Sequence, residues 1–262
     1  MAKVDTLKEI VNRKKERIAL AKQQLPEEDL KARLKDCPPT RPFIEAIHKP
    51  RTISLIAEIK KASPSRGVIR EDFNIQQIAQ DYQAVGVQAI SVLTEEDYFQ
   101  GSLEYLKEVR NFVSVPLLRK DFIIEPYQVF ESRYYGADAI LLIADLLTRE
   151  KIIELMSLAE TMGLACLVEA HNEKELKKIL NMKVPLIGIN NRDLHTLEVD
   201  SRVTERLFPL VPKEKVVVVE SGIKTSQDVL FLKILGVSAV LVGEIFMRAS
   251  NIRAKVEEIM GW

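Results

Sequence analysis

Short β-rich runs alternate with longer, charged, helix-period stretches along this chain, and no other sequence feature constrains its fold as much. From about residue 53 we count about eight β-rich runs: ISLIAEI, QAISVLT, VPLLRK, DAILLIA, LACLVEA, VPLIGIN, KVVVVES and SAVLVGE. The stretches between them, such as SLEYLKEVRNF and TREKIIELMSLAETMG, have the apolar spacing of amphipathic helices. Strands that alternate with helices in this way predict right-handed βαβ crossovers and a parallel sheet.

The number and spacing of the runs favour a closed barrel over an open sheet. The β-rich runs begin roughly 20 to 35 residues apart, and eight such units account for about 210 residues, the size of a (β/α)8 barrel. A doubly wound open sheet usually carries a glycine-rich turn after its first strand, and none follows ISLIAEI. A glycine separates helix from strand at four junctions, as expected at helix ends: Gly86, Gly136, Gly163 and Gly236. We therefore predict an α/β protein with a (β/α)8 TIM barrel.

Residues 1–50 precede the first predicted strand, and we predict that they form an N-terminal helical extension. Leu7, Ile10, Val11 and Ile18 recur at helical spacing, and several prolines follow them. Such an extension can cap the floor of the barrel or cover its mouth, and the pattern alone leaves both positions open. We predict that residues 1–262 form a single barrel domain that includes this extension.

The composition argues against several classes of function. Lys plus Arg and Asp plus Glu number 38 each, so no overall field favours nucleic acid or an anionic membrane. The two cysteines, Cys37 and Cys166, lack the paired spacing of a disulfide framework or a zinc ribbon. The N-terminus holds no apolar signal core, and no run approaches the roughly 18 apolar residues of a membrane span. We therefore expect a cytoplasmic protein without a nucleic-acid or membrane partner.

Charged and amide side chains stand at the carboxyl ends of the predicted strands, where the catalytic residues of a (β/α)8 barrel lie. Glu58 and Lys60 are two apart in the first strand and so share one face of it. The others are Lys120 in LLRKDF, Glu169 in LVEA, Asn190 and Arg192 in GINNRD, and Glu220 and Ser221 in VVESG. These residues can also fill the barrel with ion pairs as a purely structural layer. Burying three glutamates and two lysines is costly, however, and close acids and bases shift one another's pKa, so we favour a catalytic site.

A second group of residues has the features of a phosphate site. Gly222 in ESGI and Gly243 in VGEI follow the last two predicted strands and precede helices, where free N–H groups and the helix dipole favour an anion. Barrel enzymes often bind phosphate at this position. Lys60 and Ser63 from the first loop can complete the site, although SPSRG can equally form a plain turn. We therefore predict a small-molecule phosphorylated substrate.

Six segments, in the same order along the chain, resemble a known family. AEIKKASPS closely resembles the first-strand signature of the indole-3-glycerol phosphate synthase family, and LRKDF, LVEAH, GINNRDL, VVESGI and LVGE resemble its later strand ends. The resemblance covers essentially the whole chain, and it implies that the N-terminal extension covers the barrel mouth. At the phosphate end Glu244 follows Gly243, where some members have serine or threonine. We still count Glu244 among the phosphate-binding residues.

The resemblance implies a lyase of tryptophan biosynthesis that acts on 1-(2-carboxyphenylamino)-1-deoxyribulose 5-phosphate. Ring closure, loss of carbon dioxide and dehydration convert this substrate to indole-3-glycerol phosphate. The family requires neither a metal nor an organic cofactor, and His48, His171 and His195 do not have the spacing of metal ligands. We expect these histidines to lie in loops or at the surface. We also expect a monomer, and the sequence leaves an oligomer open.

The resemblance also implies a role for each matching position. Lys120 matches the general acid of ring closure, and Glu58 and Glu169 match residues that stabilise charge on the anilino nitrogen. Glu169, together with Lys60 or Glu58, would then supply the base and the acid of the dehydration. Asn190, Glu220 and Ser221 would hold the hydroxyl groups of the sugar. Arg192 would either order these polar residues or contact the carboxylate of the substrate. The residues that would pack against the aromatic ring are Phe122, Leu141, Leu197 and Leu241.

Two other functions stay open from the sequence. A phosphoribosylanthranilate isomerase would need a cysteine base and an aspartate acid at its strand ends, whereas Cys166 lies inside LACLVEA. A non-catalytic barrel would bind a sugar phosphate or a protein, but it would have no need for Glu58, Lys120 and Glu169 together. An assay for the indole product distinguishes these functions from the synthase.

Overall fold

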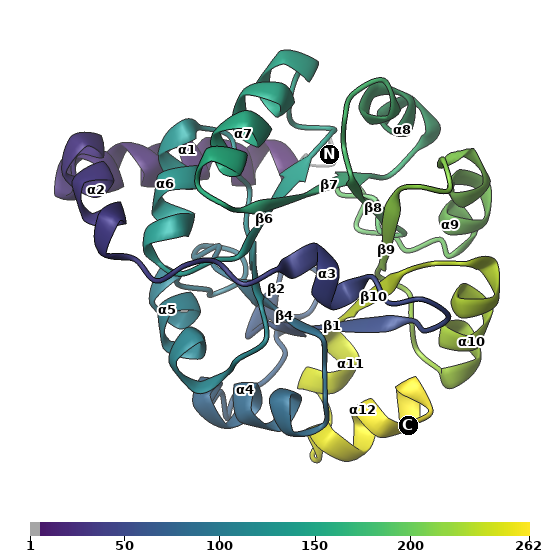
Figure 1. The fold of residues 1–262 in the computed structure, drawn as a ribbon. Helices are drawn as coiled ribbons and strands as arrows, with labels where there is room; N and C mark the ends of the chain where they lie inside the picture. The colour runs from purple at the N-terminus through teal and green to yellow at the C-terminus, as the bar shows by residue number, and fades with distance from the viewer. Residues whose placement is uncertain (1–5) are drawn as a thin grey trace, which may run out of the picture.

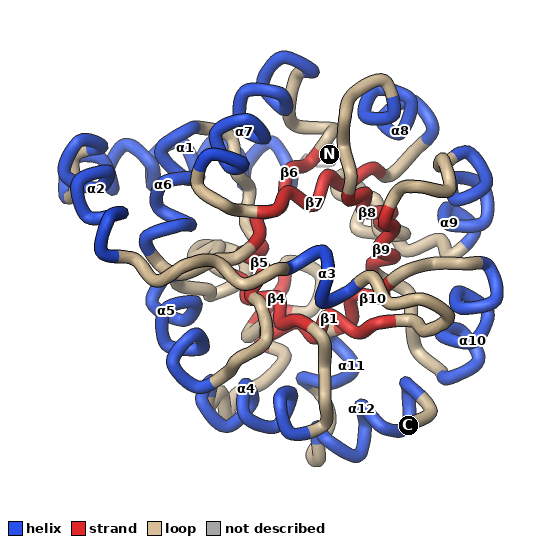
Figure 2. Tube along the Cα trace, viewed as in Figure 1, coloured by secondary structure: helices blue, strands red, loops and turns tan. Residues whose placement is uncertain are grey.

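The computed structural model describes residues 6–262, and at its centre eight parallel strands close into a barrel (Figure 2). The strands are β1 Ser54–Ile59, β4 Ala89–Leu93, β5 Leu117–Lys120, β6 Ala139–Ile143, β7 Ala165–Ala170, β8 Leu186–Asn190, β9 Val216–Glu220 and β10 Ala239–Val242. They are hydrogen-bonded in the order β1-β10-β9-β8-β7-β6-β5-β4, and β4 pairs with β1 to close the ring. Each strand lies within one of the β-rich runs, so the predicted TIM barrel is confirmed.

Helices surround the barrel; most of them connect successive strands, and the last two follow β10 (Figure 1). They are α4 Ile75–Ala84, α5 Leu103–Phe112, α6 Pro126–Tyr134, α7 Arg149–Thr161, α8 Glu173–Leu180, α9 Arg202–Leu207 with the 3-10 turn η2 Phe208–Leu210, α10 Ser226–Leu235, α11 Glu244–Met247 and α12 Ile252–Met260. A small antiparallel hairpin, β2 Ala62–Ser63 and β3 Gly67–Val68, lies in the loop after β1. No helix in the described part of the chain is both long enough and apolar enough to cross a membrane.

Polar residues in the loops fix where many of these helices begin. The side chain of the N-cap residue accepts a hydrogen bond from a backbone N–H of the first turn in six helices, at Asn74, Ser102, Thr148, Asn172, Thr225 and Asn251. Such a cap satisfies an N–H that the helix itself leaves unpaired. The caps therefore define the lengths of the loops that carry the candidate site residues.

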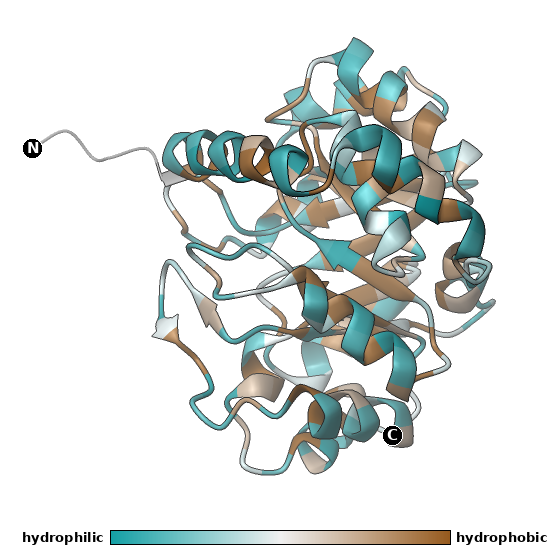
Figure 3. Ribbon diagram, turned by 90° about the vertical axis from the view of Figure 1, so that its left-hand side faces the viewer, coloured by the Kyte–Doolittle hydropathy of each residue, from teal (hydrophilic) through white to brown (hydrophobic). Residues whose placement is uncertain are grey.

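The alternation of side chains along the strands divides the core into two layers. Residues such as Leu55, Leu117 and Val168 face the helices and form the outer layer. Ile56, Leu118, Leu167 and Val218 belong to the inner layer, which fills the barrel. Figure 3 shows mostly hydrophilic residues, in teal, on the helices that surround these layers. Glu58, Lys120, Glu169 and Glu220 follow the inner residues by two positions and therefore point into the barrel.

The N-terminal extension contains three helices and contacts both ends of the barrel. They are α1 Thr6–Gln24, α2 Glu27–Arg33 with the 3-10 turn η1 Leu34–Asp36, and α3 Phe43–Ile47. α3 lies across the amino ends of the strands, where Phe43 and Ile47 close the inner core (Figure 2). Leu7 and Ile10 of α1 instead meet the loops at the carboxyl ends. The sequence left open whether the extension caps the floor of the barrel or covers its mouth; in the structure α3 caps the floor and α1 lies at the mouth. Residues 1–5 lie outside the described part.

Candidate active site

The carboxyl ends of the strands surround a cavity of about 700 Å³ to which every barrel strand contributes. The predicted residues that line it are Glu58, Lys60, Lys120, Phe122, Leu141, Glu169, Asn190, Arg192, Leu197, Glu220, Ser221, Gly222, Leu241, Gly243 and Glu244. Ser63 lies instead in an adjoining cavity of about 70 Å³ beneath α1, which Lys60 also lines. The fold therefore brings the predicted catalytic residues and most of the predicted phosphate residues into one space.

Lys120 lies between two buried carboxylates at the end of β5. Its Nζ donates hydrogen bonds to Oε2 of Glu169 at 2.9 Å and to Oε2 of Glu220 at 2.6 Å. Burial opposes the charge of this ammonium, but the charges of Glu169, Glu220 and Glu58 outweigh burial and raise the pKa of Lys120 above its usual value. Lys120 therefore carries a proton at neutral pH, which a general acid requires.

Glu169 and Glu220 share Lys120 but differ in protonation. Burial opposes the ionisation of Glu169, yet the charge of Lys120 and the contact with His171 outweigh it and lower the pKa of Glu169. Burial and the charge of Glu169 raise the pKa of Glu220 to about 8. Near neutral pH the pair therefore holds one proton, on Glu220, and Glu169 is the ionised base.

The second oxygen of Glu220 lies beside β8, away from solvent. Its Oε1 is buried and has no hydrogen-bond partner within residues 6–262. Gly188 on β8 makes room for it, because a Cβ at this position would lie 2.8 Å from Oε1. A buried carboxylate oxygen without a donor is costly, and this cost favours the protonated, uncharged form of Glu220.

Glu58 and Lys60 form a second acid–base pair on the same wall. Nζ of Lys60 lies 2.5 Å from Oε2 of Glu58, and the Glu58 side chain is largely buried. Gly243 passes directly beside this pair: a Cβ there would lie 2.7 Å from the Cβ of Glu58 and 2.5 Å from its Oε2. Glycine at 243 is therefore needed to leave space for Glu58, a requirement that the sequence did not reveal.

One side of the cavity is rich in cations. Its lining there includes Lys60, Arg66, Arg192, Lys224 and Arg248, together with Gly222 and Gly243. The carboxylate of Glu244 lies between two of them, 3.2 Å from Nε of Arg66 and 3.8 Å from Nη2 of Arg192. Guanidinium groups recognise phosphate and carboxylate in the same way. The position of Glu244 thus indicates where an anion is stabilised in this cavity.

Asn190 and Ser221 add polar groups at the ends of β8 and β9. Oδ1 of Asn190 accepts a hydrogen bond from the backbone N–H of Arg192 at 3.0 Å, which orients the amide. Ser221 has a φ of 65°, in the left-handed region that residues other than glycine rarely adopt. Such backbone strain is concentrated at functional sites, and here it lies directly after Glu220.

The remaining lining is apolar and includes two aromatic rings. Phe122 follows β5, and its ring lies 6.3 Å from the ring of Phe99, measured between centroids. Aliphatic side chains of the lining include Leu93, Leu141, Ile143, Leu194, Leu197 and Leu241. A flat aromatic ligand can pack against such a surface, whereas a phosphate cannot. The cavity therefore offers different environments to the two ends of an elongated substrate.

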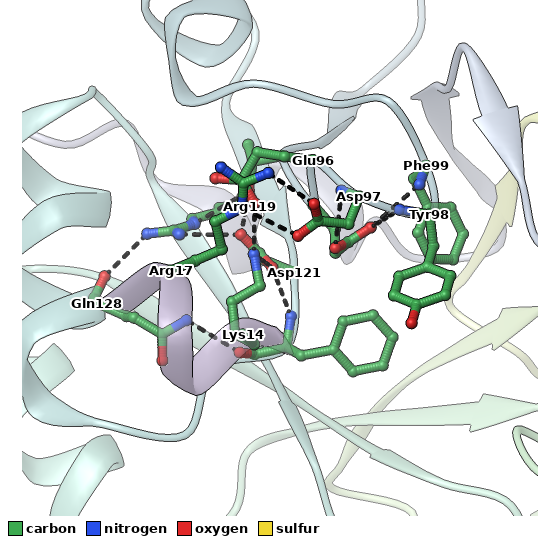
Figure 4. A network of polar contacts seen from close by, with 12 residues as sticks. Lys14, Arg17, Glu96, Asp97, Tyr98, Phe99, Arg119, Asp121 and Gln128 are labelled. Carbon is green, nitrogen blue, oxygen red and sulfur yellow. Dashed lines mark hydrogen bonds and ion pairs between the residues drawn. The ribbon is translucent and has the colours of Figure 1, made fainter. Parts of the chain in front are cut away.

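Buried ion pairs connect α1 to two loops at the cavity mouth (Figure 4). Nζ of Lys14 lies 2.8 Å from Oε2 of Glu96, in the loop after β4, and 2.9 Å from Oδ1 of Asp121, directly after Lys120. Arg17 donates two hydrogen bonds to Asp97, at 2.6 and 3.0 Å. The Lys14 side chain is only 3% exposed, so its ammonium depends on these partners for its charge.

The same network fixes the residues on either side of Lys120. Asp121 accepts hydrogen bonds from Arg119 at 2.9 Å, from Thr94 at 2.6 Å and from the backbone N–H of Phe122 at 2.8 Å. Burial would raise the pKa of Asp121, but Lys14 and Arg119 outweigh it and lower the pKa below its usual range. The backbone of β5 around Lys120 is therefore held by charges that come in part from α1.

Several cavity residues escaped the sequence analysis. Asp121 directly follows Lys120, Lys224 lies two positions after Gly222, and Arg66 lies three positions after Ser63; their charge was the available signal. Phe99 and Arg248 lie in segments that contain no predicted site residue. Phe99 reaches the cavity because Glu95 folds its loop, accepting N–H groups of Asp97, Tyr98 and Phe99. Hydrogen bonds of this kind depend on tertiary structure.

Comparison with known proteins places this cavity in context. A family model for indole-3-glycerol phosphate synthase matches residues 7–259. The curated indole-3-glycerol phosphate synthase of Alkaliphilus metalliredigens is 46% identical over 253 residues, which cover 97% of both chains. That of Acetivibrio thermocellus is 52% identical over 216 residues, 82% of this chain and 83% of the relative.

Solved structures support the fold at much lower identity. The 3-hexulose-6-phosphate synthase of Salmonella typhimurium aligns with a TM-score of 0.65 at 13% identity, over 80% of this chain and 97% of that one. This likeness concerns the barrel alone, whereas the family match extends over the catalytic layer and the helices of the N-terminal extension. The chain therefore belongs to the indole-3-glycerol phosphate synthase family.

Proposed function

We infer that this chain is a carboxy-lyase of tryptophan biosynthesis that converts 1-(2-carboxyphenylamino)-1-deoxyribulose 5-phosphate to indole-3-glycerol phosphate. The observation that supports it best is the position of Lys120, an ammonium bonded to Glu169 and Glu220 inside a cavity with a cationic side and an apolar side. The substrate has a ketone that needs an acid, a phosphate and an aromatic ring. These three parts match the three regions of the cavity.

The phosphate occupies the cationic side in our proposal. Arg66, Arg192 and Lys224 supply charge, while Gly222 and Gly243 allow the backbone to approach. Glu244 contributes its backbone N–H, since its carboxylate would repel the phosphate and must leave the two arginines when the phosphate binds. Ser63 supports the loop from the adjoining cavity, where its Oγ lies 3.5 Å from Oγ of Ser65.

Ring closure takes place between the apolar side and Lys120. The ring carbon that bears the carboxylate attacks the ketone, and Lys120 donates a proton to the oxygen as the carbon–carbon bond forms. Positive charge then develops on the anilino nitrogen, and the carboxylates of Glu58 and Glu169 stabilise it. Phe122, Leu141, Leu197 and Leu241 hold the ring, and Asn190, Glu220 and Ser221 bind the sugar hydroxyls.

Decarboxylation and dehydration complete the reaction. The electrons of the bond to carbon dioxide return to the six-membered ring, and its aromaticity is restored. Glu169 then takes a proton from the carbon next to the nitrogen, while Lys60 gives a proton to the departing hydroxyl. The ion pair of Lys60 with Glu58 keeps that acid on the cavity wall. No step requires a metal or an organic cofactor.

An assay of the product tests this function against its alternatives. Purified protein supplied with the substrate, without metal or nucleotide, should produce the fluorescence of indole-3-glycerol phosphate. An isomerase would leave the indole ring unformed, and a binding barrel would show substrate affinity without product. The isomerase is also disfavoured by Cys166, which belongs to the outer core layer and whose burial raises its pKa to about 12. Absence of product from folded protein would exclude the synthase.

The chain is one domain in our proposal, with the segment up to about residue 50 as part of it. Leu7 and Ile10 of α1 and Phe43 of α3 belong to the same inner core cluster as the strands. All eight strands of this chain contribute to the cavity, and we propose that the protein acts as a monomer. We place the protein in the cytoplasm, as suits a biosynthetic enzyme with two unpaired cysteines.

Lys14→Met should impair catalysis although Lys14 does not line the cavity. The change removes the ammonium that connects α1 to Asp121 and Glu96, so that Lys120 and Phe122 lose part of their support. We expect kcat/KM to fall about tenfold or more, because small displacements of catalytic groups are costly. Lys15→Met is the matched control, since Lys15 is exposed on the same helix. A lower melting temperature with unchanged kinetics would limit Lys14 to a role in stability.

A further inference from the structure

His171 lies behind Glu169, in the turn between β7 and α8, and contacts two carboxylates. Its Nε2 lies 3.0 Å from Oε1 of Glu169, and its Nδ1 lies 3.0 Å from Oε2 of Glu175 on α8. The Nε2 contact is close but not aligned as a hydrogen bond, so its main effect is that of charge. A chain of carboxylate, imidazole and carboxylate thus extends from α8 to the cavity wall.

The position of His171 is fixed by its own loop. Oε2 of Glu175 also accepts the backbone N–H of His171 at 2.8 Å, and the Asn172 side chain bonds to the other oxygen of Glu175. Asn172 in turn caps α8 through the N–H of Glu175 at 3.0 Å. The His171 side chain is 8% exposed. These contacts hold the imidazole in one orientation, with Nε2 toward Glu169.

The contact with His171 is the main difference between the surroundings of the two carboxylates that share Lys120. Glu169 and Glu220 are both almost fully buried, and both accept a hydrogen bond from the same ammonium. Glu169 has the imidazole on its far side, whereas Oε1 of Glu220 has no hydrogen-bond partner in the described chain. With one ammonium between two buried carboxylates, a second positive charge decides which carboxylate is ionised.

We propose that His171 is a positioning residue that, as an imidazolium held by Glu175, orients the Glu169 carboxylate and directs the shared proton to Glu220. This inference rests on the proposed role of Glu169 as the base. Burial disfavours the charged imidazole, but its contacts with Glu169 and Glu175 outweigh burial and raise the pKa of His171 to about 10. The imidazolium therefore persists throughout the range in which the enzyme would work.

The pH dependence follows from the groups that surround this chain. Glu169 of β7 and Glu175 of α8 face His171, while Lys120 of β5 and Glu220 of β9 face Glu169 from the cavity. Below a pH of about 8, the pKa of Glu220, the carboxylate pair holds one proton. In the native protein this proton lies on Glu220, so the base stays ionised. Without the imidazolium the proton moves in part to Glu169, and the base recovers only at a higher pH than in the native protein, because the loss of a positive charge raises the pKa of the pair.

The test compares single-turnover rates of His171→Gln with the native enzyme between about pH 6 and pH 10, measured by indole fluorescence. The amide retains a donor but carries no charge. We expect a loss of about 10- to 100-fold at pH 6.5 that becomes smaller as the pH rises toward about 10, within the range that general bases contribute. Glu175→Gln should show a smaller loss in the same direction. His48→Gln, at an exposed histidine directly after α3, is the matched control and should behave as the native enzyme.

The outcomes separate the inference from the proposed function. A rate that falls equally at all pH values, or not at all, would overturn the role of His171. If His171→Gln fails to fold, the profile of Glu175→Gln decides, and an unshifted profile rejects the proposal. Glu169→Gln tests the function itself: if it abolishes turnover while both other variants keep the native profile, only the inference about His171 fails.

Discussion

Lys120→Met is expected to lower the single-turnover rate by about 10² to 10⁴, because the change removes the acid that protonates the ketone oxygen. Methionine retains the length and most of the volume of the lysine side chain, so the cavity keeps its shape. KM should change little, since Lys120 contacts Glu169 and Glu220 rather than the cationic side. A rate above about a tenth of the native value, with chemistry rate-limiting, would show that Lys120 is not the acid of ring closure.

Removing Lys120 also leaves two buried carboxylates without their shared cation, and this effect must be separated from the loss of the acid. Near neutral pH Glu220 already holds a proton, so the charge that loses its cation is that of Glu169. The pKa of Glu169 should therefore rise, because a buried carboxylate without a cation is strongly unfavourable. The pH profile of Lys120→Met separates the two effects: if the rate stays low at a pH where Glu169 is ionised again, the missing acid explains the loss.

Lys60→Met provides the contrast at the end of β1, which only β4 separates from β5 and Lys120. Lys60 pairs with Glu58 and lines both the main cavity and the small one that contains Ser63. Its loss should therefore raise KM as well as lower kcat, because a contact near the phosphate disappears with the acid. If KM is unchanged in Lys60→Met and the single-turnover rate falls only slightly in Lys120→Met, then Lys60 is the acid of ring closure instead of Lys120.

The barrel could be predicted because its signal is local. Each strand is a continuous apolar run, each helix has its own period, and the polar residues at strand ends stand out against the apolar strands. The alternation of side chains then placed Glu58, Lys120 and Glu220 on the inner face without knowledge of the tertiary structure. The sequence therefore predicted the composition of the catalytic layer.

The partners of these residues could not be predicted in the same way. Lys14 bonds to Asp121 across more than a hundred positions of sequence. The place of Lys14 between Ile10 and Ile18 on the apolar face of α1 was an available signal of burial, but it does not identify the partner. His171 was expected in a loop, and it lies in one, but its contacts with Glu169 and Glu175 depend on how the β7–α8 turn folds. Gly243 was assigned to phosphate alone, whereas the packed structure also requires it beside Glu58.

A substrate that lacks the phosphate should react with a kcat/KM lower by a factor on the order of 10² to 10⁴. The phosphate takes no part in bond making, so this loss measures how far its binding positions the ketone against Lys120 and the ring against Phe122. Adding inorganic phosphite should restore part of the rate, because the dianion can occupy the cationic side without being attached to the sugar. Nearly equal kcat/KM for the two substrates would refute the phosphate site.

Two lysine variants locate this effect within the cavity. Lys224 lines the cationic side directly after Gly222 and Ile223, whereas Lys233 lies exposed on α10, the helix that follows this loop. Lys224→Met should reduce the ratio of kcat/KM between the phosphorylated and the dephosphorylated substrate, because it weakens only the reaction that uses the phosphate. Lys233→Met should leave the ratio unchanged. If both variants alter the ratio equally, the general charge of the protein surface acts on the phosphate, and Gly222 and Lys224 do not form its binding site.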